Sequence, residues 1–321
     1  MNENMNEKMK ILIGYDGSEC ANAALDDLQR SGLPAEAEVT VLTAADVFIP
    51  PEISAEDSAE EPLPPNVPHG VKLAWERSKR AFEDAERLAA KAADILRAKF
   101  PDYEITPEAH ADTPHWAIIM KGYEWKPDLI VVGSHGRSAL GRMILGSVSQ
   151  KVLYESRSTV RIARGRNIPV NTPIRLVVAA DGSPDAGAML DVIVSRNWEK
   201  GTLVKLITAA EPFHQYGVEP DAQMNRIRDI QTLAEQKLSK AGLKVIPVVE
   251  EGDPKHILIR EAEAWNADCI FLGAQGHRFL DRVLMGSVSS TVAARAHCSV
   301  EVVRKASNTD SNESRINVSE Q

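Results

Sequence analysis

One glycine-rich stretch occurs twice in this chain, and the repeat limits the folds that the sequence can adopt. The first copy, residues 128–149, reads DLIVVGSHGRSALGRMILGSVS, and the second, residues 268–289, reads DCIFLGAQGHRFLDRVLMGSVS. Each copy begins with an apolar run typical of a buried parallel strand and leads into a helical pattern. Strand, glycine-rich loop and helix therefore follow one another twice, which predicts two copies of one α/β unit.

The loop between strand and helix has the composition of an anion-binding site. Small residues let the backbone approach a ligand, while the free N–H groups and the dipole of a helix N-terminus attract a phosphate. A serine, Ser147 or Ser287, stands before each helix and is expected to be its N-cap. The alternative is that the glycines only form tight turns, but a turn needs one or two glycines rather than this repeated pattern.

The spacing G-x2-G-x9-G-[ST] resembles the nucleotide-binding signature of the universal stress protein family, in its ATP-binding branch. The pattern is formed by Gly133, Gly136, Gly146 and Ser147 in the first copy and by Gly273, Gly276, Gly286 and Ser287 in the second. The resemblance covers nearly all of residues 9–304. It implies an adenine-nucleotide-binding protein of the stress response, a regulator or scaffold with ATP, alone or with Mg2+, as its ligand.

Strands and helices alternate in both halves, which predicts parallel sheets with helices on both faces. The family resemblance implies two tandem doubly wound, Rossmann-like domains, each with a five-stranded parallel sheet of order 3-2-1-4-5. We expect the two domains to pack as an internal pseudo-dimer. Pairing of the fifth strands, residues 159–163 and 299–303, would cover two exposed sheet edges.

The expected domain boundaries follow from composition. Residues 1–8 and 305–321 are polar and are expected to be disordered, the first domain spans 9–164 and the second spans 174–304. The first domain carries a Pro- and acid-rich insertion over residues 48–70, which we interpret as a surface loop, with a binding loop as the alternative. A helix over residues 71–100 is expected to cover the sheet, with a coiled coil as the alternative.

Acidic residues follow the first strand of each half, at Asp16 and Asp181. Ligands of doubly wound sheets bind beyond the strand ends where the strand order reverses, so Asp16 and the first glycine loop should converge on one crevice. Helix capping is the alternative role for both aspartates. The family pattern implies that Asp16 lies near the nucleotide and that backbone groups near Ala44 meet adenine, with Asp181 and Ala209 as counterparts.

The loop residues differ between the two copies. In the first copy we expect backbone N–H groups of Gly136, Gly146, Ser147 and Val148 to face phosphates, with a hydroxyl from Ser147 or Ser149 and a charge from Arg137. The second-copy equivalents are Gly276, Gly286, Ser287, Val288 and Ser289. The first copy also has Ser134, His135 and Ser138 where the second has Ala274, Gln275 and Arg278, with His277 in place of Arg137. We expect both copies to bind a nucleotide with unequal affinity, and His135 to lie beside the ligand without a catalytic role.

Composition excludes several classes of function. A net charge of −9 argues against a nucleic-acid backbone as partner. The sequence has no apolar run of transmembrane length and a polar N-terminus, so we expect no membrane partner and a cytoplasmic location. The three cysteines match no zinc spacing, and no metal site is expected.

No catalytic constellation is evident, because there is no Gly-Lys-Ser/Thr loop and no residue that clearly positions a water. We therefore expect a binding protein rather than an enzyme. A slow ATPase or nucleotidylyl transferase and a scaffold that binds no nucleotide remain alternatives, as does a homodimer.

Overall fold

The computed structural model describes residues 8–47, 68–135, 145–165, 172–210, 220–276 and 285–305. The elements of the first half are β1 (Met9–Gly14), α1 (Glu19–Asp27), the 3-10 turn η1 (Leu28–Arg30), β2 (Ala37–Ala45), α2 (His69–Lys99), β3 (Glu104–Ala111), α3 (Pro114–Trp125), β4 (Leu129–Gly133), α4 (Ser147–Glu155) and β5 (Thr159–Ala163). Those of the second half are β6 (Arg175–Ala179), α5 (Pro184–Ser195), β7 (Leu203–Ala210), α6 (Pro220–Lys240), β8 (Lys244–Glu251), α7 (Pro254–Ala264), β9 (Cys269–Gly273), α8 (Ser287–Arg295) and β10 (Ser299–Val303).

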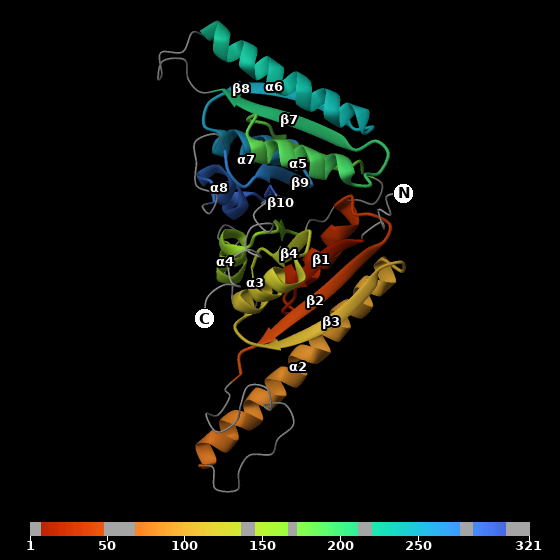
Figure 1. Cartoon of the computed structure of the whole chain (residues 1–321), viewed down its shortest axis with the longest axis vertical. Coiled ribbons are helices and arrows are strands. Elements are labelled where there is room, and N and C mark those ends of the chain that lie inside the picture. The colour runs from red at the N-terminus through yellow and green to blue at the C-terminus, as the bar shows by residue number, and fades with distance from the viewer. Residues whose placement is uncertain are drawn as a thin grey trace, which may run out of the picture.

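The strands form one ten-stranded sheet of order β3-β2-β1-β4-β5-β10-β9-β6-β7-β8. Within each half the order is 3-2-1-4-5 and every pairing is parallel, as the family resemblance implied. The order reverses between β1 and β4, and between β6 and β9, which are the places where doubly wound sheets bind ligands. Figure 1 shows the two halves stacked along the long axis of the molecule.

The two halves meet through their fifth strands, which confirms the expected internal pseudo-dimer. β5 and β10 pair antiparallel, with Val300 opposite Ile162 and Val302 opposite Val160. The pairing satisfies backbone groups that an open sheet edge would expose. β5 and β10 run in opposite directions. The strands of the two halves therefore point in opposite directions, and their carboxyl ends lie on opposite sides of the joined sheet.

Helices cover both faces of this sheet. On one face, α3, α4, α7 and α8 contribute to a single apolar cluster that also contains Ile162 of β5 and Val300 of β10. On the other face, α1 and α2 cover the first half and α5 and α6 cover the second, with separate clusters. The domains therefore share one core across their interface and keep two separate cores on the other face. Figure 1 shows α3 and α4 of the first half on the same side as α7 and α8 of the second.

The long helix of the first half begins earlier than the sequence predicted. α2 starts at His69 after Pro68, so the final residues of the expected insertion are helical. Its buried residues run from Ser78 to Leu96 and pack against β2 and β3, which makes α2 a single covering helix. Its N-terminal turns project beyond the sheet in Figure 1. The rest of the insertion, residues 48–67, and most of both expected disordered termini lie outside the described residues.

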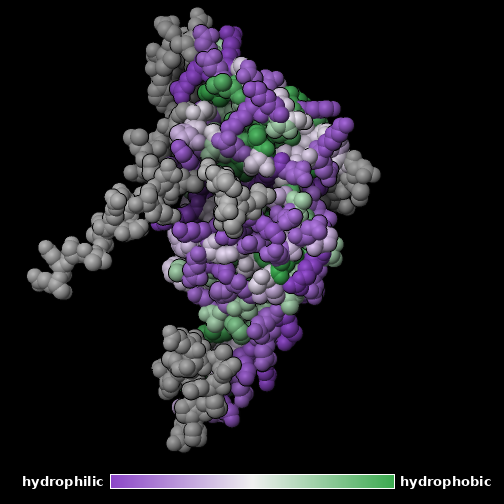
Figure 2. All heavy atoms as spheres, turned by 45° about the vertical axis from the view of Figure 1, so that its right-hand side comes forward, coloured by the Kyte–Doolittle hydropathy of each residue, from purple (hydrophilic) through white to green (hydrophobic). Residues whose placement is uncertain are grey.

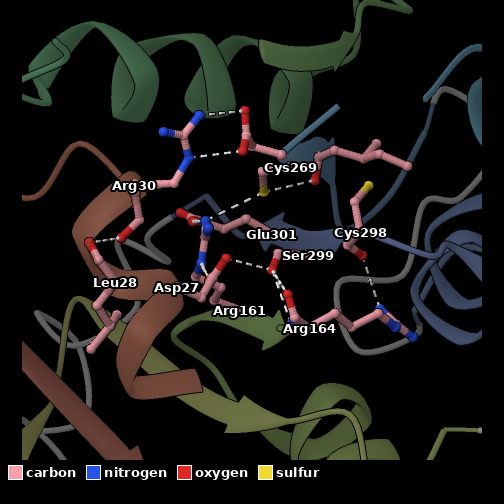
Figure 3. A network of polar contacts seen from close by, with 12 residues as sticks. Asp27, Leu28, Arg30, Arg161, Arg164, Cys269, Cys298, Ser299 and Glu301 are labelled. Carbon is pink, nitrogen blue, oxygen red and sulfur yellow. Dashed lines mark hydrogen bonds and ion pairs between the residues drawn. The ribbon is translucent and has the colours of Figure 1, made fainter. Parts of the chain in front are cut away.

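A buried network of charges holds the domain interface together (Figure 3). Arg161 Nε donates to Asp27 Oδ2 at 2.6 Å, and Arg161 Nη1 donates to Glu301 Oε2 at 2.9 Å. Arg196 of the second half donates to the same Glu301 oxygen at 3.0 Å. Arg161 and Glu301 are 1% and 0% exposed, so each charge depends on its partners to offset the cost of leaving water.

Two arginines that follow the fifth strands extend the interface in a symmetric way. Arg164 donates to the carbonyl oxygens of Ala293, at 2.6 Å, and Cys298. Arg304 donates to the carbonyl oxygens of Leu153 and Ser158, which are the equivalent positions of the first half. Each arginine therefore binds carbonyl groups near the C-terminus of the opposite domain's α4 or α8, where a positive charge is favourable.

Candidate functional site

Each half has a crevice where its first strand and its fourth strand end. In the first half, Asp16 follows β1 and its Oδ1 accepts the backbone N–H of Ser18 at 3.0 Å. Ser18 then caps α1 by accepting the N–H of Ala21 at 3.1 Å. Gly17 between them has a φ of 76°, a conformation that glycine adopts without steric cost.

The second half repeats this turn with the same chemistry. Asp181 Oδ1 accepts the N–H of Ser183 at 2.9 Å, and Ser183 accepts the N–H of Ala186 at 3.1 Å. The serine, not the aspartate, is the N-cap of the following helix in both halves. The aspartates therefore hold the turn that precedes the helix, whereas helix capping, the alternative role, is performed by Ser18 and Ser183.

The structure brings the first-strand turn and the fourth-strand loop together. Ser18 Oγ lies 3.5 Å from the carbonyl oxygen of His135, and Ser183 Oγ lies 3.3 Å from that of Gln275. In the second half a Cβ on Gly276 would lie 3.0 Å from Asp181 Oδ2. The Asp181 carboxylate thus lies next to the loop of the second half, and a side chain at Gly276 would meet it at a distance that few real Cβ contacts reach.

The glycines that end the fourth strands serve packing. A Cβ on Gly133 would lie 3.0 Å from the backbone of Cys20 in α1, and a Cβ on Gly273 would lie 3.0 Å from the backbone of Ala186 in α5. These glycines let a helix pack closely on the strand end. Their part in the repeated pattern is explained without a ligand.

The third glycine of the pattern closes the loop. Gly146 N–H donates to Ser134 O, and Gly286 N–H donates to Ala274 O, both at 2.8 Å. Gly146 was expected to offer its N–H to a phosphate, and this expectation is wrong because a carbonyl group of the same loop already accepts that proton. Gly286 is also tightly enclosed, since a Cβ there would lie 3.0 Å from Ala274 O.

The same glycines, and not the serines after them, occupy the N-cap position. α4 begins at Ser147 with Gly146 as N-cap, and α8 begins at Ser287 with Gly286 as N-cap. The predicted serine caps are therefore wrong. The physical reason is that the cap glycine is extended and its N–H closes the loop, which leaves the serine as an exposed first helical residue.

The first turn of α4 presents backbone N–H groups at the crevice. The first intrahelical hydrogen bond runs from Gln150 N–H to Gly146 O at 2.8 Å, so the N–H groups of Ser147, Val148 and Ser149 precede it. In α8 the corresponding bond runs from Ser290 N–H to Gly286 O. Each helix start thus has donors and a positive dipole end with which an anion can interact.

The third serine of each SVS run is part of the scaffold. Ser149 is buried and its hydroxyl donates to Gly133 O at 2.6 Å, and Ser289 does the same to Gly273 O at 2.6 Å. A phosphate was expected to meet the hydroxyl of Ser147 or of Ser149, and the structure disfavours Ser149 because its proton is donated to the strand end. Ser147 and Ser287 keep exposed side chains and are the better candidates for contact with a ligand.

His135 is held at the mouth of the first loop. Its Nδ1 lies 3.1 Å from Ser134 Oγ. Burial, and after it the nearby charge of Arg164, lowers the pKa of His135, so the ring is neutral at pH 7. A neutral ring contributes no charge to an anion site. Gly136, Arg137, Ser138, His277 and Arg278 lie outside the described residues.

Ala44 and Ala209 lie near the ends of β2 and β7, beside β1 and β6. Ala44 pairs in register with His110 of β3, and Ala209 pairs with Glu250 of β8. Both alanines are partly buried against the shared core. Their position at the carboxyl end of the sheet is compatible with the backbone contacts that the family pattern implies.

One residue of the second crevice was missed by sequence reasoning. Asp185 Oδ2 accepts the backbone N–H of Gln275 at 3.0 Å. Cys20 occupies the equivalent position of the first half, since both stand two residues after the N-cap serine. The second crevice therefore contains one more carboxylate than the first, and aligning the two DGS turns would have revealed it.

The described residues contain neither a metal cluster nor a membrane-spanning helix. No group of three or more His, Cys, Asp or Glu side chains that could hold a metal ion occurs there. No helix of the described chain combines the length and apolar character that a membrane span requires. Figure 2 shows a mainly hydrophilic surface with small, scattered hydrophobic areas.

The fold and the crevices define a tandem doubly wound α/β protein with one glycine-rich loop in each half. A family model described as "Universal stress protein family" matches residues 8–164 and 174–304. The chain belongs to the universal stress protein family, whose members act in the stress response.

Some relatives match nearly the whole of this chain and others match about half of it. A universal stress protein of Mycolicibacterium smegmatis is 26% identical over 301 residues, which cover 92% of this chain and 96% of the relative. One from Thermus aquaticus is 31% identical over 154 residues, which cover 48% of this chain and 97% of the relative. A universal stress protein structure from Archaeoglobus fulgidus superposes with a TM-score of 0.63 at 22% identity, covering 92% of this chain and 98% of its own.

Proposed function

We propose that this protein binds adenine nucleotides, with ATP as the main ligand, and acts as a nucleotide-dependent regulator or scaffold in the stress response. The observation that carries the proposal is the helix start in each crevice. Three backbone N–H groups of α4, those of Ser147, Val148 and Ser149, precede the first intrahelical hydrogen bond. Ser149 ties this turn to Gly133, the end of β4, which packs against α1 directly after the Asp16 turn. A phosphate chain suits such donors.

The residues in each crevice fit a nucleotide in some respects and restrict its placement in others. The exposed Ser147 and Ser287 leave the helix starts accessible, and the turn glycines keep bulky side chains away. The N–H groups of Gly146 and Gly286 are occupied, so the phosphate contacts fall to the first helical turn. Asp16 follows β1 in the same crevice, and its carboxylate can accept a hydrogen bond from a ribose hydroxyl.

Binding rather than turnover is the activity that these residues support. The described crevice contains a neutral histidine, His135, whose Nδ1 is already paired with a serine hydroxyl, and an aspartate, Asp16, whose Oδ1 holds a turn. Neither group is positioned as a general base for water attack in this arrangement. In this proposal ATP is a regulatory ligand and not a substrate, and Mg2+ would bind to the protein through the ATP phosphates.

Mass spectrometry of the ligand released from freshly purified protein tests the proposal. We expect an adenine nucleotide in an amount comparable to the protein, and hydrolysis of added ATP well below about 1 per second. Protein that contains no nucleotide and does not bind added ATP would favour a scaffold without a nucleotide. Turnover of about 1 per second or faster would favour an enzyme.

A further inference from the structure

The domain interface has two faces that the pseudo-two-fold relationship makes equivalent, but only one of them is closed. On the closed face, Arg30 Nε donates to Asp268 Oδ1 at 2.9 Å, and Arg30 Nη1 donates to Thr172 O at 3.2 Å. On the other face, Ser195 takes the place of Arg30 and Asp128 takes the place of Asp268. The short, uncharged side chain of Ser195 cannot form the ion pair with Asp128 that Arg30 forms with Asp268, so no such bridge closes the second face.

The open face is a groove of about 1330 Å3 between the first half and α5. It lies at the amino ends of β1 and β4, at the edge of the sheet opposite to the first crevice. Its lining includes six basic residues from the two halves. These are Lys8, Lys126, Arg157, Arg196, Arg304 and Lys305.

The carboxylates of the groove are engaged by other groups. Glu36 pairs with Lys8 at 3.3 Å, and Asp191 pairs with Lys237 at 2.5 Å. Asp128 accepts the backbone N–H of Lys10 at 2.8 Å. The neutral N–H leaves the charge of Asp128 in place, but basic side chains outnumber carboxylates in the lining. The groove is therefore locally positive in a chain whose net charge is −9, and such a reversal of sign favours an anionic partner.

An exposed apolar stripe leads into this groove. Trp116, Met120 and Tyr123 lie on one face of α3 at helical spacing and are 46%, 37% and 41% exposed. Tyr123 belongs to both the stripe and the groove, and the Arg157 guanidinium lies 5.2 Å from the centre of its ring. Apolar side chains aligned in this way are typical of a surface that binds another protein.

The second half shows that the fold does not require this stripe. The equivalent positions on α7, 140 residues later, are polar. The residues equivalent to Lys126 and Arg157 of the groove are also different in the second half. The second-half residues are His256, Arg260 and Glu263 on α7, with Asn266 for Lys126 and His297 for Arg157. The aromatic stripe and its basic border are thus a property of the first half alone.

We propose that the groove and the α3 stripe form a docking surface for a peptide segment of a partner protein, with acidic residues beside apolar ones. The volume exceeds the roughly 300–1,000 Å3 of a pocket for one small molecule, which favours a peptide. The acidic part pairs with Lys126 and Arg157, and the apolar part packs on Tyr123 and Met120. This partner binding goes beyond the nucleotide binding proposed above and does not depend on it.

The second half provides the variants that test this surface. Lys126→Asn/Arg157→His installs the second-half residues, and Asn suits the left-handed backbone of position 126, since Asn266 has a φ of 53° and Lys126 a φ of 50°. Tyr123→Glu likewise installs the residue of α7. The matched control is Arg228→Gln, which removes a charge from the exposed side of α6, outside the groove.

The experiment measures fluorescence anisotropy of a fluorescein-labelled peptide in which one half alternates Glu and Gly and the other consists of Leu and Ala. We expect saturable binding to the full chain that weakens as salt rises, and a loss of about ten-fold or more in Lys126→Asn/Arg157→His and in Tyr123→Glu. Arg228→Gln should bind as the unmodified chain does, and a peptide with Gln for Glu should bind weakly.

Three outcomes would overturn the proposal. Equal binding by all variants, or no binding at low salt, means that the groove does not recognise this peptide. Binding that appears only after residues 306–321 are removed means that the chain's own tail fills the groove. Tighter binding of a single-stranded DNA oligonucleotide than of the peptide assigns the surface to nucleic acid.

Discussion

Arg161 and Glu301 lie directly opposite each other in the antiparallel pair of β5 and β10. They are also equivalent in the repeat, since Glu301 stands in the second half where Arg161 stands in the first. They therefore lie on the pseudo-two-fold axis. If two first halves paired through β5 in the same way, Arg161 would face Arg161. If two second halves paired through β10, Glu301 would face Glu301. Like charges facing each other in a buried pair are destabilising, so the two residues favour association of unlike halves.

Loss of the Glu301 charge should destabilise the protein strongly. Glu301→Gln leaves Arg161 and Arg196 without the carboxylate that both now contact, and we expect a loss of about 3–5 kcal/mol in the free energy of unfolding in urea. Asp94→Asn is the matched control, because Asp94 pairs with Arg97 on the surface of α2, and it should change stability by less than about 0.5 kcal/mol. Similar values for the two variants would contradict the role of the network.

Gly32 should tolerate no side chain. It has a φ of 63°, and a Cβ would lie 2.6 Å from the Trp198 ring of the second half. Gly201 has a φ of 96° with no atom within 4 Å of its would-be Cβ, so it isolates the cost of the backbone conformation. We expect Gly201→Ala to cost about 1–2 kcal/mol, and Gly32→Ala to cost more and to alter Trp198 fluorescence. Equal costs would show that Trp198 moves away freely.

Stability should depend on pH through His135. Because burial and Arg164 lower its pKa in the folded protein, the unfolded chain takes up a proton first as pH falls below about 6.5. The free energy of unfolding should therefore decrease with falling pH in the window below 6.5, until the folded histidine is also protonated. His135→Gln should flatten this decrease measured by urea titration, whereas His69→Gln, at the exposed start of α2, should leave it in place.

Much of the fold could be predicted from the repeat, because strand and helix patterns and the two DGS turns recur in order. The sheet order came from family resemblance, and pairing of the fifth strands followed from the need to cover their edges. The loop details could not be predicted. Whether Gly146 offers its N–H to a ligand or to Ser134 depends on the path of the loop backbone, which the spacing of glycines does not specify. The same limit applies to Ser149, whose hydroxyl lies close to Gly133 only in the folded loop.

The two crevices should differ in affinity for a nucleotide because Asp185 adds a carboxylate to the second. Its Oδ2 already accepts the Gln275 N–H, but its charge still disfavours a phosphate nearby. Asp185→Cys, which installs the residue of the first half, should strengthen the weaker site several-fold in calorimetric titration with ATP. Cys20→Asp should weaken the stronger site. An unchanged second site in Asp185→Cys would remove this carboxylate as the cause of any difference.

The central proposal is that ATP phosphates bind at the first turns of α4 and α8, and one calorimetric comparison tests it most directly. Ser147→Glu places a carboxylate at the exposed first residue of α4, where it suits the helix dipole and keeps the fold stable but repels a phosphate. Ser147→Gln has the same shape without the charge. We predict two ATP sites in the unmodified protein, loss of the stronger one in Ser147→Glu, and near-normal binding in Ser147→Gln. Unchanged ATP binding in Ser147→Glu would contradict the proposal.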